Sequence, residues 1–285
     1  MAGDSDLTPS EPTPDDFLVL DDPWLTSDDV AIVTGGASGI GRATTLGLAM
    51  NGVTVVSTDM DEDGLAETVD VAEDLDVPGR VETVDANLTD DDEVASIVEA
   101  AAEVGQLRYV ANIAGLQHID PIDQFPTEKW DLLQDVMVRA PFLLTKHAMP
   151  HIRDGDGRGA IGNMASVHGH YATSAKAAYI TAKFALRGLT NAIAAEGDGD
   201  LRGFSVSVGY VLTPLMADQI QDTAEELGIS EQEVVEDRFL GQARLKDLMS
   251  PAEVANLFTF GFSSHSRHLN GADMLWDGGY TGTYE

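Results

Sequence analysis

The feature that most constrains this chain is a glycine-rich turn between a β-branched run and an amphipathic stretch. The run Val30–Thr34 predicts a buried strand, and the stretch Ile40–Asn51 predicts a helix. Between them, Gly35, Gly39 and Gly41 allow a tight turn and a close approach of the backbone to a pyrophosphate at the helix N-terminus. A glycine triplet alone is a weak signal, because packing alone can require it. Its place in a strand–turn–helix unit predicts a dinucleotide site.

The rest of the chain repeats this alternation of short β-branched runs and longer amphipathic stretches. We expect further strands at 54–58, 80–85, 109–114, 159–164 and 204–209, and further helices at 90–104, 127–151 and 175–195. Repeated βα units of this kind predict a single doubly wound α/β domain over residues 28–285, with a mostly parallel sheet. Residues 214–250 are rich in Glu, Gln and Asp and have helical spacing, which predicts a helical lid over the substrate crevice.

The chain is strongly acidic, with 49 Asp and Glu against 16 Lys and Arg and a formal net charge of −33. Such a charge repels nucleic acids and anionic membranes, so we expect neither as a partner. The acidic residues are spread along the whole chain, which favours adaptation to a salty cytoplasm over an acidic interaction surface.

The N-terminus and the residue composition also bear on location. Residues 1–27 are acidic and contain prolines, which predicts a disordered arm rather than a signal peptide. The sequence has no apolar run long enough to cross a bilayer and no cysteine, so a cytoplasmic protein without disulfides or a Cys-based metal site is expected.

The choice of nicotinamide cofactor depends on Asp59, which ends the second expected strand eighteen residues after Gly41. Its carboxylate is placed to accept hydrogen bonds from an adenosine ribose, although a chance Asp is as good an explanation in so acidic a chain. Neither Lys nor Arg occurs between Arg42 and Arg80, and the extra phosphate of NADP requires a cation. The pattern therefore predicts NAD, with Arg42 as the nearby exception.

Three polar residues predict the chemistry. Tyr179 and Lys183 are four residues apart, which places them on one face of a helix, and an ammonium beside a phenol favours the phenolate. A Tyr-x-x-x-Lys pair also occurs by chance on solvated helices. Ser166 follows the expected strand at 159–164, so that its hydroxyl can meet Tyr179 at the carboxyl edge of the sheet. The three together predict general acid–base catalysis on an alcohol or ketone.

These motifs together resemble the short-chain dehydrogenase/reductase family over residues 28 to the end. The matching segments are TGGASGIG at 34–41, NIAG at 112–115, Ser166 and YITAK at 179–183. The resemblance implies a seven-stranded Rossmann sheet, a homotetramer and hydride transfer with a nicotinamide. It implies that Tyr179 is the acid/base, that Lys183 lowers its pKa and binds ribose, and that Ser166 orients the substrate. Further cofactor contacts are implied for Ser38, Ile40, Asn87, Asn112 and Thr213.

Within that family the chain is similar to the D-3-hydroxybutyrate dehydrogenases, around residues 115–130, 165–169, 176–179 and 211–219. The similarity implies that a substrate carboxylate is bound by Gln117, His168, Lys176 and Gln219, and that Tyr210 walls the pocket. It implies interconversion of (R)-3-hydroxybutyrate and acetoacetate, a step of ketone-body metabolism.

The residues give a separate reason to expect an anionic substrate. Lys176 and Lys183 are two of only five lysines, and both lie near the expected reacting centre of an otherwise negative protein. A small carboxylate would find a cation and amide donors there. Solvent exposure of Lys176 and local hydrogen bonding of His168 are the alternative explanations.

Two positions depart from the family pattern. Met137 stands where many members have an asparagine that holds a water of the proton relay, and Val208 replaces a common proline before Gly209. Another secondary alcohol, a sugar or a 3-oxoacyl group therefore stays open as the substrate, as does a non-catalytic NAD-binding regulatory role.

Overall fold

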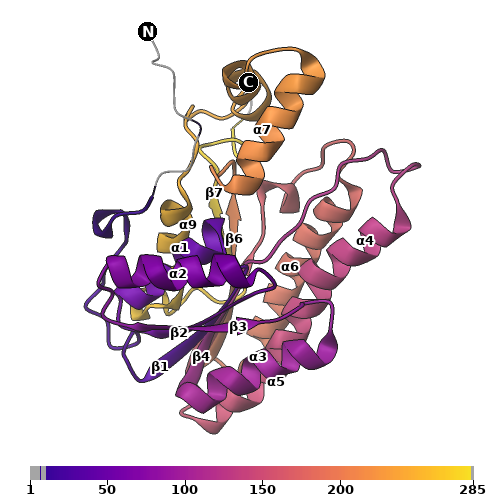
Figure 1. Ribbon diagram of the computed structural model, residues 1–285. Coiled ribbons are helices and arrows are strands. Elements are labelled where there is room, and N and C mark those ends of the chain that lie inside the picture. The colour runs from indigo at the N-terminus through magenta and orange to yellow at the C-terminus, as the bar shows by residue number, and fades with distance from the viewer. Residues whose placement is uncertain (1–6, 8–10, 284–285) are drawn as a thin grey trace.

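A seven-stranded parallel sheet forms the centre of the protein. The computed structural model describes residue 7 and residues 11–283. The strand order is β3-β2-β1-β4-β5-β6-β7, and each neighbouring pair is parallel. Helices cover both faces (Figure 1), which confirms the predicted doubly wound α/β fold. The strands are β1 (Asp29–Thr34), β2 (Thr54–Asp59), β3 (Arg80–Asp85), β4 (Gln106–Asn112), β5 (Gly159–Met164), β6 (Leu201–Val208) and β7 (Ala272–Trp276).

The middle strands are buried on both faces, as helix-covered parallel strands must be. All six residues of β1 are buried, and so are all eight residues of β6. The two edge strands β3 and β7 expose part of their side chains instead. One face packs on α1 (Gly39–Met50), α2 (Glu62–Asp74) and α9 (Pro251–Phe262), and the other on α3 (Asp91–Val104), α5 (Ala140–Asp154) and α6 (Ala177–Glu196).

The single helix predicted at 127–151 is divided into three parts. It consists of α4 (Thr127–Gln134), a π-helical turn η2 (Asp135–Arg139) and α5. Pro141 lacks the N–H that would bond to the carbonyl of Met137, and its ring crowds that carbonyl in a regular α-helix. The backbone widens at this point, and the N–H of Ala140 bonds to Asp135 O.

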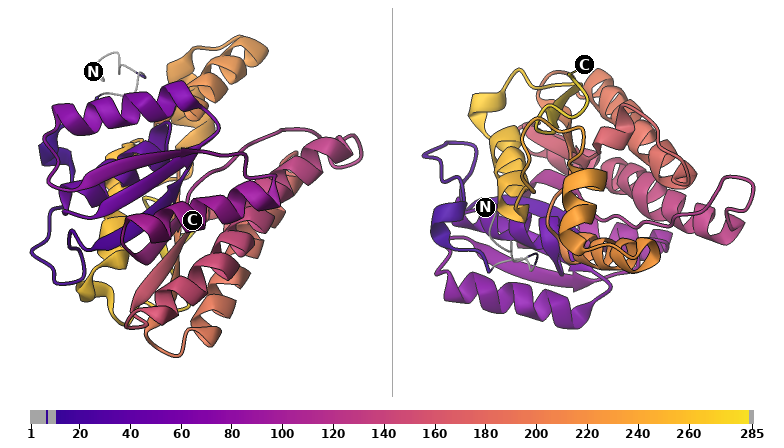
Figure 2. Two further views of the ribbon diagram at one scale, coloured as in Figure 1. Left: turned by 60° about the horizontal axis from the view of Figure 1, so that its bottom comes forward. Right: turned by 90° about the horizontal axis from the view of Figure 1, so that it is seen from above.

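Residues 214–250 are helical at first, as predicted. They contain α7 (Pro214–Leu227), the short α8 (Glu231–Glu233) and the π-helical turn η4 (Val234–Phe239). These elements bury an apolar cluster of their own, which includes Met216, Ile220 and Phe239. In Figure 1 and in the left-hand view of Figure 2 this segment projects from the upper end of the molecule rather than packing on a face of the sheet.

The N-terminal segment 11–27 is packed on the body, so the prediction of a disordered arm is wrong for these residues. Phe17 is buried among residues of α1 and α9, and Leu18 N donates to Asn256 Oδ1 at 2.7 Å. The ring of Trp24 contacts the guanidinium groups of Arg158 and Arg202, which lie 5.6 and 5.4 Å from its centre. The apolar contacts of Phe17 and the cation–π contacts of Trp24 thus hold this segment on the body despite its acidic composition. Residues 1–6 and 8–10 lie outside the described residues.

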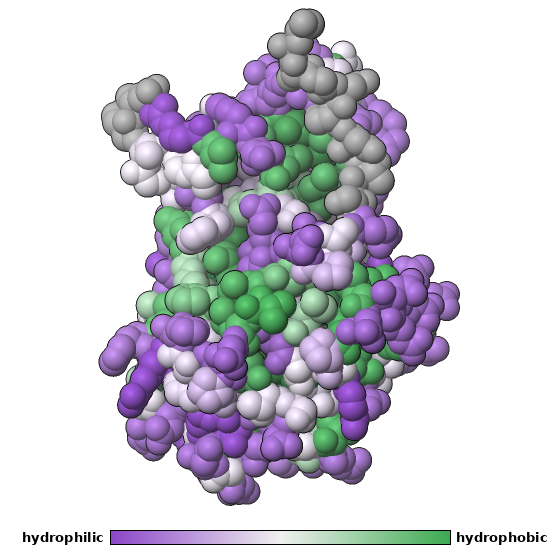
Figure 3. Space-filling view, turned by 90° about the vertical axis from the view of Figure 1, so that its left-hand side faces the viewer, coloured by the Kyte–Doolittle hydropathy of each residue, from purple (hydrophilic) through white to green (hydrophobic). Residues whose placement is uncertain are grey.

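The surface is polar over much of the face drawn in Figure 3. Hydrophilic residues dominate the upper and lower parts of that face, and apolar residues gather near its middle. Within residue 7 and residues 11–283, no helix is both long enough and apolar enough to cross a membrane.

Candidate active site

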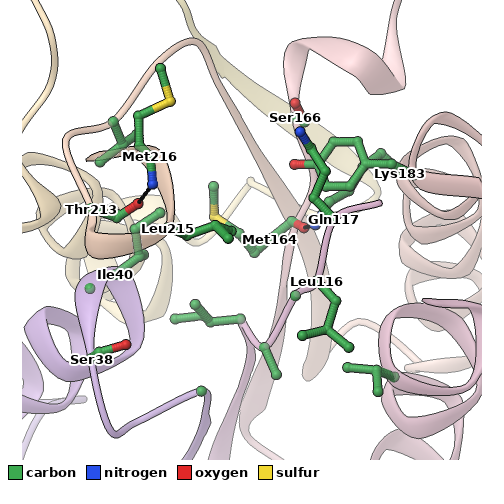
Figure 4. A pocket seen from close by; sticks show the side chains of 18 of the residues that line it. Ser38, Ile40, Leu116, Gln117, Met164, Ser166, Lys183, Thr213, Leu215 and Met216 are labelled. Carbon is green, nitrogen blue, oxygen red and sulfur yellow. Dashed lines mark hydrogen bonds between the residues drawn. The ribbon is translucent and has the colours of Figure 1, made fainter. Parts of the chain in front are cut away.

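A cleft of about 710 Å³ opens at the carboxyl edge of the sheet. Ligands of doubly wound proteins bind in this position, because the loops after successive strands converge there. Thr213 caps α7 by accepting the N–H of Met216 at 3.2 Å, and Figure 4 shows this bond beside Ser38 and Ile40 of the glycine turn. The predicted site residues that line the cleft are Gly35, Ser38, Gly39, Ile40, Asp59, Asn87, Gln117, Ser166, His168, Lys176, Tyr179, Lys183, Tyr210, Thr213 and Gln219.

The glycines of the turn bring bare backbone to the wall of the cleft, next to the side chains of Ser38 and Ile40. Gly35 and Gly39 have φ values of +74° and +52°, which L side chains rarely adopt. Gly41 does not line the cleft, but a Cβ there would lie 1.9 Å from Gly35 O. Its role is therefore to let α1 start directly against the turn. A bare backbone at a helix N-terminus is the arrangement that binds a pyrophosphate.

The ribose end of the cleft carries a carboxylate and no free cation among the described residues. Asp59 Oδ2 accepts the N–H of Ala37 at 3.3 Å, which ties β2 to the glycine turn. Arg42 lies at the same turn, where its guanidinium donates to Ala37 O at 2.5 Å, and it is paired with Glu67 at 2.8 Å. Within the described lining, lysine or arginine occurs only as Lys176 and Lys183. Among the described residues, the charged groups at this end are therefore one carboxylate and one guanidinium that is already paired.

Asn87 and Asn112 are placed differently from each other. Asn87 lies on the cleft wall, exposed, with its side-chain oxygen bound to Thr89. Asn112 is buried at the end of β4 and outside the cleft lining, and its amide donates to Asn163 Oδ1 at 2.8 Å. The structure therefore places Asn112 as a link between β4 and β5, and not against the cofactor cleft where it was expected.

Ser166, Tyr179 and Lys183 meet at the centre of the cleft, as predicted. Ser166 caps the turn η3 (Val167–Gly169) after β5, with its Oγ accepting the N–H of His168 at 3.2 Å. Lys183 is buried on α6, and its Nζ lies 5.2 Å from the ring centre of Tyr179 and donates to Met164 O at 2.7 Å. In Figure 4 Ser166, Gln117 and Lys183 lie across the cleft from Ser38 and Ile40.

Burial governs the titration of this centre. Desolvation raises the pKa of Tyr179, and the hydrogen bond with Ser166 opposes that rise. Desolvation also lowers the pKa of Lys183 to about 7. The protein alone therefore does not favour the phenolate that the sequence led us to expect. A positively charged ring bound in this cleft would favour the phenolate form of Tyr179.

The substrate end is built from three loops. Gln117, after β4, donates from Nε2 to Gln219 Oε1 on α7 at 3.2 Å. His168 is buried, and its Nε2 lies 3.1 Å from Thr173 Oγ1. Desolvation lowers the pKa of His168 to about 4, with Lys176 adding to the effect. The four predicted carboxylate ligands thus share one cleft.

Lys176 is the cation of this end. It precedes α6 as its N-cap and lines the cleft, and desolvation lowers its pKa. No ion pair joins it to any Asp or Glu of the described residues. Ala175 before it has φ +63°, an unusual conformation for alanine, and Ala175 O accepts the N–H of Asp120 at 2.9 Å. The loop containing Asp120 thereby fixes the backbone that carries Lys176.

Aromatic and apolar residues complete the wall. Tyr210 stacks on Phe239 of the lid with a ring separation of 5.0 Å and meets Tyr280 edge-on at 5.9 Å. Sequence reasoning missed the apolar lining, because such side chains carry no chemical signature that separates them from core residues. These residues are Leu116, Leu132, Val136, Leu215 and Met216.

Met137 is fully buried in η2, just outside the cleft lining. A Cβ added to Gly115 would lie 3.6 Å from its sulfur and 3.9 Å from Lys183 Nζ, so the thioether lies on the lysine's side of the site. A thioether donates no hydrogen bond. Any proton relay past Lys183 must therefore differ from one built on an amide.

Comparison with known proteins agrees with this geometry. The family model described as enoyl-(acyl carrier protein) reductase matches residues 35–281. A D-β-hydroxybutyrate dehydrogenase of Rhizobium meliloti (strain 1021) is 32% identical over 254 residues, covering 88% of this chain and 98% of that protein. A 3-oxoacyl-(acyl-carrier-protein) reductase of Thermotoga maritima is 31% identical over 252 residues, covering 88% and 96%.

Solved structures show the same architecture. Levodione reductase superposes with a TM-score of 0.84 at 26% identity, covering 91% of this chain and 100% of that one. A putative NAD(P)-dependent gluconate 5-dehydrogenase from Beutenbergia cavernae with bound NADP superposes with a TM-score of 0.81 at 26% identity, covering 92% and 100%.

Proposed function

The chain belongs to the short-chain dehydrogenase/reductase family of NAD(P)-dependent oxidoreductases, and we propose that it interconverts (R)-3-hydroxybutyrate and acetoacetate with NAD. The observation that carries this proposal is Lys176. Its ammonium group lines the cleft, is partly desolvated and has no ion pair among the described residues. The protein around it carries a formal net charge of −33. A partly buried charge of this kind is stabilised by an anionic partner, and a small carboxylate supplies one.

The roles of the residues follow from their positions. Tyr179 accepts the proton of the substrate hydroxyl, and Ser166 orients the oxygen atom of that hydroxyl. A bound nicotinamide would accept the hydride from the carbon that carries this hydroxyl. Gln117 and Gln219 donate to the substrate carboxylate, which Lys176 and His168 flank. The rings of His168 and Tyr179 are 5.9 Å apart, which favours a hydroxyl separated from the carboxylate by a short carbon chain.

The preference for NAD rests on the ribose end of the cleft. Asp59 would repel a ribose phosphate, and Arg42 already pairs with Glu67. We therefore expect Gly35, Ser38, Gly39, Ile40 and Asp59 to bind the adenosine and pyrophosphate, with Lys183 and Thr213 nearer the nicotinamide.

The first test is reduction of NAD with (R)-3-hydroxybutyrate in about 2 M KCl, where an acidic surface is screened. The (S) enantiomer and Tyr179→Phe are the controls. Turnover of the (R) form alone, lowered by about 10²- to 10⁴-fold in Tyr179→Phe, supports the proposal. A folded protein that binds NAD but turns over neither enantiomer excludes it.

A second test concerns the substrate class. Lys176→Ala should lower kcat/KM for 3-hydroxybutyrate by about 10²-fold, as expected for the loss of a charge-assisted contact. A neutral secondary alcohol should be unaffected. The matched control is Lys146→Ala, an exposed lysine on α5. Equal losses on both substrates would argue against a carboxylate at this position.

A 3-oxoacyl substrate is the second candidate. It is favoured by the relative from Thermotoga maritima, named as a 3-oxoacyl-(acyl-carrier-protein) reductase. Reduction of a 3-oxoacyl thioester that exceeds turnover of acetoacetate, and that does not depend on Lys176, would establish this alternative.

The setting of the enzyme is a further part of the proposal. We infer a cytoplasmic homotetramer in a salt-rich cell, acting in ketone-body metabolism without nucleic-acid or membrane partners. The dispersed negative charge supports the salt-rich setting, since salt screens its self-repulsion. Sedimentation and activity measured across a range of KCl concentrations test the oligomer and the salt dependence together.

A further inference from the structure

Asp273 forms a polar network that the proposed mechanism does not use. It lies on the edge strand β7, and its side chain is only 12% exposed. Its Oδ1 accepts the hydroxyls of Ser205 and Ser207 on β6, and its Oδ2 lies 2.9 Å from His170 Nε2. Because an ionised carboxylate only accepts hydrogen bonds, His170 donates from Nε2. Asp273 thus links His170, which directly follows η3, to the serines of β6.

His170 closes the turn that carries two site residues. The turn η3 begins with Ser166 as its cap, contains His168, and ends with His170 N donating to Val167 O at 2.9 Å. The backbone of this turn therefore sets the positions of Ser166 and His168 relative to Tyr179. A second attachment comes from α6, where Arg187 donates to Gly169 O at 2.6 Å.

The side chain of His168 has little else to fix it. Its hydrogen-bond partner is Thr173, which lies in an exposed loop. Its other neighbours are aromatic, with Tyr171 and Tyr179 at ring separations of 5.1 and 5.9 Å. The orientation of His168 thus depends mainly on the backbone of η3, and so on what anchors that turn.

We propose that His170 and Asp273 are positioning residues that tether η3 to β7 and thereby hold His168 and Ser166 in place for catalysis. Neither residue lines the cleft, so neither touches the substrate. The link runs from the buried serines of β6 through Asp273 and His170 to the turn. The expected effect on substrate affinity rests on the proposed function, because it uses His168 as a carboxylate ligand.

Loss of the tether should affect the substrate and not the cofactor. Removing one charge-assisted hydrogen bond that orders η3 should raise KM for 3-hydroxybutyrate by about tenfold, with a smaller change in kcat. The affinity for NADH should stay unchanged, because the glycine turn and Asp59 lie on β1 and β2, across the sheet from β7.

The test is a double-mutant cycle with His170→Phe, Asp273→Asn and the combined variant. Because both residues act through one bond, the combined variant should be no worse than either single variant. The second readout is hydrogen exchange of the amides of residues 166–171, which should rise equally in all three. His170→Asn, which retains a side-chain N–H, should recover part of the loss. His265→Phe, which removes a different His–Asp contact at 3.7 Å from Asp22, is the control and should change neither readout.

Each outcome decides the proposal. Effects that multiply in the combined variant, or exchange at 166–171 that does not change, would overturn the tether. If the wild-type protein does not turn over 3-hydroxybutyrate, the proposed function fails separately. The exchange measurement then decides the tether by itself, since it needs no substrate.

Discussion

The two ends of the cleft are built in different ways. The cofactor end is made of backbone, with the turn at Gly35 and Gly39 shaped by positive φ angles and by the contact that excludes a Cβ at Gly41. The substrate end is made of side chains from three separate segments, which follow β4, β5 and β6 and are joined by bonds such as that between Gln117 and Gln219. A backbone site is fixed by local sequence, whereas a side-chain site depends on how distant segments pack.

This difference in construction separates binding of the cofactor from recognition of the substrate. A backbone cradle accepts a cofactor that many enzymes share, and its glycines can hardly vary. The substrate end includes an independently packed lid and a strained residue, Ala175, and it can change without disturbing the sheet. Four substitutions test how far the two ends are independent.

The largest effect is expected from Gly41→Ala. The added Cβ would lie 1.9 Å from Gly35 O, so the turn must move and NADH should bind at least about 10²-fold more weakly. The measurement is titration of NADH by fluorescence. Gly47→Ala, on the same helix but with its nearest neighbour 3.3 Å from the new Cβ, should bind NADH normally. Equal losses of NADH affinity in both variants would show that the substitutions act through the helix and not through the turn.

A smaller effect should follow Phe239→Ala. Phe239 packs on Tyr210 within the lid cluster, which is separate from the core under the sheet. Truncation should loosen the lid and raise KM for the substrate by roughly tenfold, with little change in the urea midpoint of global unfolding. Phe258→Ala, on the core-facing side of α9, should instead destabilise the whole fold by about 3–5 kcal/mol. A global loss from Phe239→Ala would mean that the lid is not a separate unit.

The substrate end should also show a pH-dependent stability. Burial, with Lys176 nearby, lowers the pKa of His168 to about 4 from an ordinary value of 6.5. The unfolded chain therefore binds an extra proton between these values, and the stability due to neutral His168 is lost as pH falls through that window. The loss is up to about 3 kcal/mol. Urea unfolding of His168→Gln should show a flatter acid limb, whereas the exposed His268→Gln should match the wild type.

The smallest effect is expected at Ala175. Glycine adopts φ +63° more easily than alanine, so Ala175→Gly should be neutral or stabilising by up to about 1 kcal/mol. Ala175→Val should destabilise and raise KM for the substrate, because a β-branched residue disfavours this conformation and Lys176 follows directly. Thermal denaturation with substrate kinetics measures both. A stabilising valine would show that this backbone is not strained.

Much of the fold followed from local patterns. The buried β-branched runs predicted β1 and β2 closely, because fully covered parallel strands require such residues. The bounds of β3 and β5 were also predicted, from the regular alternation of short strands with helices. α2 was missed because its sequence is dominated by acidic residues, and its apolar contacts, such as Leu65, are few. The docking of residues 11–27 was missed because their partners lie in distant segments, which no local pattern reveals.

The site was predicted unevenly for the same reason. Ser166, Tyr179 and Lys183 converge because one strand–helix unit carries all three. Asn112 was expected in the cleft but bonds to Asn163 within the sheet, since its position depends on the pairing of β4 with β5. The His170–Asp273 contact joins residues 103 positions apart, so only the folded chain reveals it.

The docked N-terminal segment has a consequence for synthesis on the ribosome. Leu18 bonds to Asn256, 238 residues later, and Asp22 bonds to Ser264, 242 residues later. At translation rates of about 5–20 residues per second, the segment emerges roughly 10 to 50 seconds before its partners exist. During that interval Phe17 and Trp24 are exposed on the nascent chain. This segment leaves the ribosome long before its partners and is thus among the last to reach its final position. Its docking therefore requires that synthesis has passed α9.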